Sequence, residues 1–317
     1  ATRMRRRWMP PPPRIGGDVF TRASARAIAK LGPADRKALD VAFEEIGADA
    51  PVLHKALATG AHVSAVASLA GAWETLDERE RALVRDPVGR RGAGAVNFLG
   101  VRAKQVDART CGPASLGLML MIGDPFVGLW LATGRRVGEY LPLEPLVTEV
   151  VTKDVRTVEE RWRSLQHELH REATRWALGP FPWPRAFGTP PWRLDNAVRF
   201  AGLRFHTRMV DDRDHDDLAA LFAHASVALA DGIPVPLYVG GDSRRGLAAA
   251  VPRHVVLAVG REPGAFLIFE PGSGAIVPVK DADIRATGNQ ALPGFGNWSR
   301  ATCVVLPALR RADSLAP

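Results

Sequence analysis

QVDARTCGPASLGLMLM, the stretch from Gln105 to Met121, takes the chain from a polar loop into an apolar run with helical pattern. The boundary falls at Cys111, one of two cysteines. A thiol at the start of a helix lies beside backbone N–H groups without helical partners and beside the positive end of the helix dipole. Both favour the thiolate, the nucleophilic form of cysteine. Because a lone cysteine can equally be a small buried apolar side chain, a catalytic role also requires a base, an orienting group and an oxyanion donor.

The composition is that of a globular protein. Its 317 residues are 46% hydrophobic and 24% charged, enough for one large domain or two modest ones with a sizeable core. With only Cys111 and Cys303, a disulfide framework is not expected and a thiolate zinc site is excluded. A bond between these two cysteines would rule out Cys111 as a nucleophile. We expect no metal and no other cofactor.

The chain is basic, with a formal net charge of +8, and much of the excess lies in a proline-rich arm, residues 1–16. We expect this arm to be flexible and to be able to contact an acidic partner. Nucleic acid is the less favoured partner, because aromatic side chains are not interleaved with the basic ones. Prolines stand where a signal peptide would have its apolar core, so we expect a cytoplasmic location or export by a non-classical route.

An apolar stretch, Leu116–Thr133, has about the length of a membrane span. Asp124 and Pro125 interrupt it, and three glycines reduce its hydrophobicity. We therefore predict a buried core segment and no membrane span.

Residues 17–95 are predicted to form a helical N-terminal subdomain. Pro33 and Pro51 suit first helical positions, and Thr75–Glu78 matches a capping box. Helices this short must pack on one another or on the rest of the chain. The expected helices are Val19–Leu31, Pro33–Ile46, Pro51–Thr59, His62–Trp73 and Leu76–Arg85. A glycine-rich joint, Val88–Val96, follows them.

Residues 96–317 are predicted to form a second domain, in which helices precede an antiparallel sheet. After the Cys111 helix, the expected helices are Pro125–Ala132, Val158–Ala177 and Asp216–Ala230. Strand-like runs separated by Gly and Pro turns follow at hairpin spacing: Val235–Val239, His254–Val259, Phe266–Glu270, Ile276–Val279 and Thr302–Leu306. This order of elements predicts an α+β fold.

Three further residues match the needs of a cysteine nucleophile. His254 opens the run HVVLAVG, and Glu270 ends the next strand, in FLIFEPGSG. A tight hairpin at Arg261–Gly264 would place both side chains at the same end of adjacent antiparallel strands. There His254 would act as general base and acid, and Glu270 would hold its ring in one tautomer. Gln105, together with the Cys111 backbone N–H, would donate to the oxyanion.

The pattern Q-x5-CGPAS resembles the nucleophile segment of papain-like cysteine peptidases, and among these it is most similar to the bacteriocin-processing peptidases that remove double-glycine leaders. In that group a Gln precedes a Cys-Gly pair, a late strand begins with His, and an Asp-Pro-x-x-Gly turn follows, whose Asp orients the His. This chain has the same order over residues 103–122 and 231–279, with Glu270 in place of the Asp. The resemblance implies a papain-like fold with the Cys111 helix packed on an antiparallel sheet.

The same resemblance implies hydrolysis of an amide or peptide bond in a protein or peptide substrate, through an acyl-thioester on Cys111. A deamidase or a transglutaminase-type acyltransferase on the same triad is an alternative, as in secreted bacterial effectors similar to this fold. A papain-like domain without activity, used for binding, is the second alternative.

Other polar clusters are weaker candidates. The acidic run Val210–Asp217 lacks the glycine and the final glutamate of a calcium loop, and we expect it to cap a helix. The HELH run at His167–His170 does not have the H-E-x-x-H spacing of zinc peptidases. Asn297, which precedes a tryptophan, is a second candidate for orienting His254.

Overall fold

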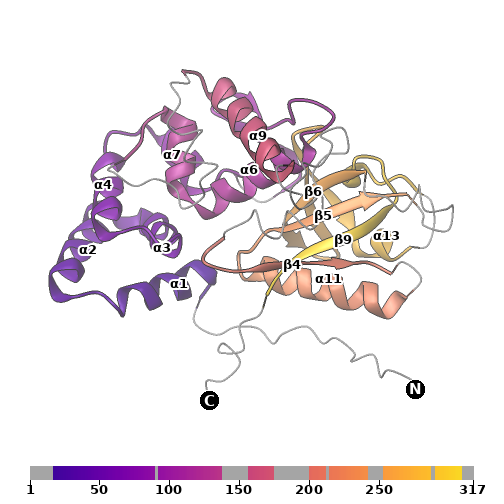
Figure 1. The fold of residues 1–317 in the computed structure, drawn as a ribbon, viewed down its shortest axis with the longest axis horizontal. Helices are drawn as coiled ribbons and strands as arrows, with labels where there is room; N and C mark the ends of the chain where they lie inside the picture. The colour runs from indigo at the N-terminus through magenta and orange to yellow at the C-terminus, as the bar shows by residue number, and fades with distance from the viewer. Residues whose placement is uncertain are drawn as a thin grey trace, which may run out of the picture.

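Helices and an antiparallel sheet make up the structure, which is α+β as predicted (Figure 1). The computed structural model describes residues 17–89, 92–137, 156–174, 200–211, 214–241, 253–286 and 290–308. The N-terminal helices form one end of the molecule and the sheet forms the other, with α6 and α9 between them (Figure 1). The basic arm, residues 1–16, lies outside the described residues, so its contact with an acidic partner stays a prediction.

The predicted N-terminal helices are confirmed to within three residues at each end. They are α1 (Val19–Ile28), α2 (Pro33–Ile46), α3 (Pro51–Ala58), α4 (Val63–Trp73) and α5 (Glu78–Arg85). The capping box predicted at Thr75–Glu78 was wrong. The box is formed by Asp77 and Glu80, because the helix begins at Glu78 and the Thr75 N–H still donates to the C=O of Ala72 at the end of α4.

The apolar stretch around Asp124 forms two helices, α6 (Cys111–Gly123) and α7 (Pro125–Thr133), which meet at 110°. Nearly every residue of both is buried, as predicted for a core segment. Asp124 separates them because its carboxylate accepts the Phe126 N–H and caps α7. Among the described residues no single helix is long and apolar enough to cross a membrane; only this bent pair reaches the length. Helix α9 (Val158–Thr174) packs on α6 and α7, and its expected end at Ala177 lies outside the described residues.

The sheet has seven strands among the described residues, in the order β1-β8-β7-β6-β5-β9-β4, and neighbouring strands are antiparallel throughout. The strands are β1 (Gly94–Ala95), β4 (Phe205–Met209), β5 (Val235–Gly240), β6 (His254–Glu262), β7 (Ala265–Glu270), β8 (Ala275–Lys280) and β9 (Arg300–Pro307). Two short strands, β2 (Asn97–Phe98) and β3 (Val101–Arg102), form a separate pair. Helix α11 (His215–Ala230) packs along the sheet against β5, β6 and β9, and α6 contacts β6.

All five predicted strands are present, and each is longer than expected. The β6–β7 hairpin extends to the pair Glu262 and Ala265, so its turn is the dipeptide Pro263-Gly264, with Gly264 at φ +75°. Strand β4 was not predicted. Among the described strands it lies at the edge of the sheet and pairs with β9 alone, and its sequence FHTRM carries two charged or titratable side chains that mask the strand pattern.

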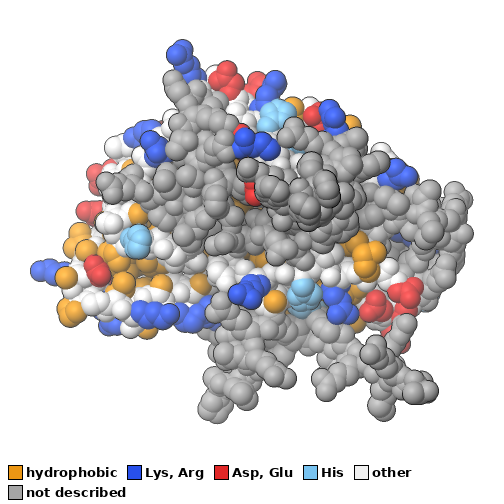
Figure 2. Space-filling view, viewed as in Figure 1, with side chains coloured by type: hydrophobic (Ala, Val, Ile, Leu, Met, Phe, Trp, Pro, Cys, Tyr) orange, Lys and Arg blue, Asp and Glu red, His pale blue; other side chains and the backbone are white. Residues whose placement is uncertain are grey.

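The N-terminal helices share one continuous hydrophobic core with the rest of the described chain. Helix α5 packs on α7, and α1 is tied to the turn after α11: the Val19 N–H donates to the Asp231 carbonyl at 3.1 Å. The Arg22 guanidinium also donates to the Asp231 carboxylate, at 2.5 and 2.6 Å. The domain boundary at residues 95 and 96 stays a prediction. On the face shown in Figure 2, described basic side chains are interspersed with acidic ones.

Candidate active site

Cys111 is the first residue of α6 and is 5% exposed. The helix begins there because Thr110 leaves helical geometry, with φ −101° and ψ 16°, and Pro113 fits the first turn. The Cys111 thiol therefore lies where the helix presents its unpaired N–H groups and the positive end of its dipole. Both cysteines are free, so the Cys111 thiol is not held in a disulfide. Cys303 lies buried on β9, and burial raises the pKa of its thiol to about 11.

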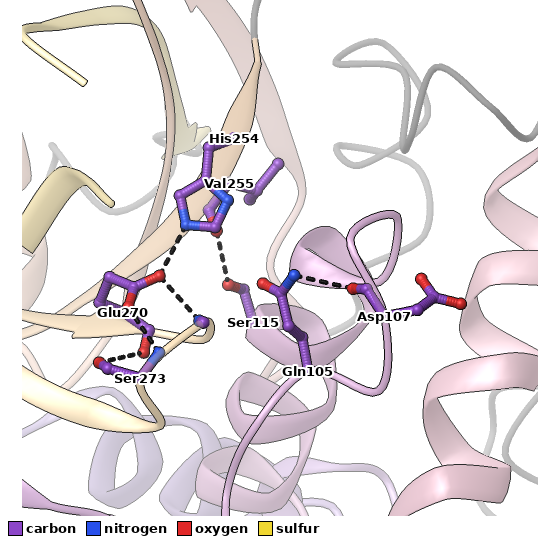
Figure 3. Close-up of polar contacts among 8 residues, drawn as sticks. Gln105, Asp107, Ser115, His254, Val255, Glu270 and Ser273 are labelled. Carbon is purple, nitrogen blue, oxygen red and sulfur yellow. Dashed lines mark hydrogen bonds and ion pairs between the residues drawn. The ribbon is translucent and has the colours of Figure 1, made fainter. Parts of the chain in front are cut away.

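His254 and Glu270 lie at the same end of adjacent antiparallel strands, as predicted. His254 Nε2 lies 2.8 Å from Glu270 Oε1 (Figure 3). The β6–β7 register pairs Leu257 with Phe269, which makes the two side chains diagonal neighbours rather than a directly opposed pair. The Glu270 side chain reaches the imidazole along this diagonal.

The turn after β7 holds the Glu270 carboxylate in place. Oε1 accepts the Gly272 N–H at 2.7 Å, and Oε2 accepts the Ser273 N–H at 2.6 Å (Figure 3). Burial alone would raise the pKa of Glu270, but the hydrogen bonds from His254, Gly272 and Ser273 outweigh burial and lower it to about 2. Glu270 is therefore ionised and acts as an acceptor for the histidine N–H.

The charge balance of the site favours a protonated His254. Burial lowers the pKa of this imidazole, but hydrogen bonds and charge attraction from Cys111 and Glu270 outweigh burial and raise it to about 9. Because Nε2 faces Glu270, Nδ1 is the ring nitrogen left for the Cys111 side chain. The thiol of Cys111 and the carboxylate of Glu270 thus both favour the charged form of the same imidazole.

Gln105 lies on the loop before α6, where the sequence placed the oxyanion donor. Its Nε2 donates to the Asp107 carbonyl at 2.7 Å (Figure 3), and its backbone N–H donates to the Pro271 carbonyl at 2.8 Å. Oε1 is buried and has no hydrogen-bond partner among the described residues. An amide NH2 carries two protons, so one donor of Gln105 remains for a ligand.

Two contacts that hold the site together were not predicted. Ser115, one turn into α6, donates from Oγ to the Val255 carbonyl at 3.3 Å, which joins the cysteine helix to the histidine strand (Figure 3). Gln166 of α9 is fully buried, accepts the Val106 N–H at 3.0 Å and donates to the Lys104 carbonyl at 3.1 Å. Ser115 belongs to the CGPAS motif, four residues after the cysteine. This spacing places it on the same face of the helix as Cys111 and could have indicated its contact with the histidine strand. No local pattern marks Gln166.

The other sequence candidates lie elsewhere. Asp214 caps α11 by accepting two backbone N–H groups, as expected for the acidic run. In the HELH run, Glu168 pairs with Arg171 at 2.6 Å. Of the two candidates for orienting His254, Glu270 and Asn297, Glu270 is the one hydrogen-bonded to the ring. Within the described ranges, no three His, Cys, Asp or Glu side chains gather as a metal-binding group.

Comparison with known proteins returns no relative. No family model matches the chain, no curated protein matches it, and no solved structure matches it. Function is therefore inferred from the geometry of the site.

Proposed function

We propose that this protein is a papain-like cysteine hydrolase that cleaves amide or peptide bonds of a protein or peptide substrate. The observation that carries the proposal is the hydrogen-bonded pair His254–Glu270, in which a buried carboxylate lies 2.8 Å from a ring nitrogen; the thiol at the start of α6 helps to raise the pKa of the same imidazole. A nucleophile, a base and an orienting group in this order are the minimum set for thiol-dependent acyl transfer.

The proposed reaction proceeds in two halves. The thiol proton passes to His254 Nδ1, and the Cys111 sulfur attacks the substrate carbonyl to form a tetrahedral intermediate. The backbone N–H of Cys111 and the free N–H of Gln105 donate to its oxyanion. His254 then protonates the leaving amine, the C–N bond breaks, and an acyl-thioester remains on Cys111. In the second half, water gives a proton to His254 and attacks the thioester, which releases the acid and restores the thiol.

Glu270 supports both halves without losing its charge. Its carboxylate stabilises the imidazolium that forms when His254 accepts a proton and keeps the ring in the tautomer that leaves Nδ1 toward the thiol. The complete set argues against a domain that only binds, since binding has no chemical need for a thiol, an imidazole and a buried carboxylate in one line.

The first experiment compares the two thiols. At neutral pH, iodoacetamide should alkylate Cys111 much faster than Cys303, which is buried and whose pKa is about 11. His254→Ala should slow alkylation of Cys111 and leave Cys303 unchanged. Site-resolved mass spectrometry gives both rates in one sample. Equally slow alkylation of both thiols would contradict the proposal.

A second experiment identifies the reaction. The protein is incubated with a peptide mixture, with and without an added primary amine, and Cys111→Ala serves as the control. New peptide termini indicate hydrolysis, a mass increase of a converted glutamine or asparagine indicates deamidation, and an incorporated amine indicates acyl transfer. The proposal expects new termini that the Cys111→Ala variant does not produce.

A further inference from the structure

A short turn covers the hydrogen bond between His254 and Glu270. It runs from the 3-10 helix η4 (Pro293–Phe295) into Gly296, which is left-handed at φ +62°. The fully buried side chain of Phe295 anchors the turn in the core, and η4 packs on strands β6, β7 and β8. Its own backbone bonds close it further, including the Asn297 N–H to the Leu292 carbonyl at 3.0 Å.

Gly296 lies directly against the imidazole. A Cβ on this residue would stand 2.7 Å from His254 Cδ2, 2.8 Å from His254 Nε2 and 3.5 Å from Glu270 Oε1. Real Cβ atoms do not approach other heavy atoms to under 3.0 Å, so any side chain here requires the ring or the turn to move. The backbone of Gly296 therefore stands where water would otherwise reach the ring edge that donates to Glu270.

Burial of the pair agrees with this placement. The His254 and Glu270 side chains are 11% and 8% exposed. A hydrogen bond that is kept from water lies in a lower dielectric and is stronger than an exposed one. The titratable groups that act on His254 are Cys111 from α6 and Glu270 from β7, and the turn adds no charge of its own to the ring.

We infer that Gly296 is a positioning residue for the proposed active site: its backbone closes the edge of the His254–Glu270 pair, limits rotation of the ring and excludes water from the hydrogen bond. This inference rests on the proposed function for its catalytic meaning, but the closed pair can be tested without a substrate.

The test uses two glycine-to-alanine variants with the same backbone cost. Gly296→Ala introduces a Cβ at φ +62° against the ring, whereas Gly264→Ala introduces one at φ +75° in the β6–β7 turn, where nothing lies within 4 Å. Both variants should lower the urea midpoint, because both force an L-residue into the left-handed region, and Gly296→Ala should lower it further because its Cβ also clashes with the ring. Only Gly296→Ala should disturb the imidazole.

Two readouts separate positioning from stability. We expect Gly296→Ala to lower the NMR titration midpoint of His254 and to slow alkylation of Cys111 by iodoacetamide, by at most about 10-fold for each unit that the midpoint falls. Gly264→Ala should leave both unchanged. Identical titration and alkylation in the two variants would overturn the inference.

A measurement on the wild-type chain covers the case in which Gly296→Ala does not fold. The Nε2 proton of His254 should exchange slowly with water, unlike the ring protons of His62, which is exposed. Exchange as fast as that of His62 would overturn the inference. If the His254 proton is protected but Cys111 is alkylated no faster than Cys303, the positioning role stands and the proposed hydrolase activity fails.

Discussion

Glu270→Gln keeps the shape of the orienting side chain and removes its charge. The amide oxygen can still accept from His254 Nε2 and from the Gly272 N–H, which share Oε1, but the Ser273 N–H then faces an NH2 group and loses its acceptor. The substitution therefore tests whether the negative charge, and not merely a hydrogen-bond acceptor, prepares His254 as the partner of the thiolate.

The magnitude follows from the pKa of His254, which is raised from 6.5 to about 9. That difference corresponds to roughly 3 kcal/mol of preference for the imidazolium, shared between Glu270 and Cys111. If Glu270 supplies half, about 1.5 kcal/mol is lost in the variant, and the affinity of His254 for its proton falls about 10-fold. We expect the His254 titration midpoint to move down toward its ordinary range and alkylation of Cys111 at pH 7 to slow by at most that factor.

Stability should change in a defined pH window. The raised pKa of His254 contributes stability that is full below pH 6.5 and is lost as pH rises through about 9. The lowered pKa of Glu270 contributes stability that is full above pH 4.5 and is lost as pH falls through about 2. The two pKa shifts describe the same ion pair, so their contributions are not added. The free energy of unfolding of the wild type should exceed that of Glu270→Gln by at most roughly 3 kcal/mol, with the greatest difference between about pH 4.5 and 6.5.

The assay measures urea unfolding from about pH 3 to 9, a range that spans the ordinary pKa values of Glu270 and His254. The same variants are then compared by NMR titration of His254 and by the rate at which Cys111 is alkylated. Glu262→Gln, at the exposed far end of β6 in the same hairpin, is the matched control and should leave all three unchanged. An unchanged His254 titration in Glu270→Gln would refute the assignment of Glu270 as the orienting charge.

Three further predictions concern residues that hold the helices around the site. Burial raises the pKa of Asp124 from 3.8 to about 6, so the charged carboxylate destabilises the folded state by about 3 kcal/mol above this pKa. Asp124→Asn should therefore raise the free energy of unfolding by up to about 3 kcal/mol at pH 8 and leave it unchanged near pH 3. A variant no more stable at pH 8 would contradict this. Arg22→Gln should lower the free energy of unfolding in urea by roughly 2 kcal/mol, because the partly buried Asp231 loses a charged donor. An unchanged urea midpoint would show that the Arg22–Asp231 ion pair does not stabilise the fold. Gln166→Leu should leave the Val106 N–H without its acceptor, whereas the Lys104 carbonyl keeps the Trp162 indole N–H. We expect a cost of about 1 kcal/mol and slower peptide cleavage, with alkylation of Cys111 unchanged; an equal loss of both rates would place the effect on the thiol instead.

Local signals account for the parts of the fold that the sequence predicted. Helix α2 begins at Pro33 and ends before Gly47, and the backbone preferences of these two residues alone set both ends of the helix. Strand β7 is a run of apolar residues between a Pro-Gly turn and a Glu-Pro-Gly turn. By contrast, β4 forms a strand by pairing with β9, which lies almost a hundred residues later in the chain. The local sequence of β4 does not predict this pairing.

The candidate site divides in the same way. The sequence by itself nominated Cys111, His254 and Glu270, because a helix start, a strand start and a strand end on one hairpin are local features whose geometry follows from periodicity and turn length. It also determined that the fold is α+β. Tertiary structure alone decided that Glu270 reaches His254 along a diagonal, that Gln166 holds the loop before Cys111 from 60 residues away, and that Gly296 closes the pair. These last contacts join segments distant in the chain, and their partners are chosen by the strand order and by helix packing, which no local pattern encodes.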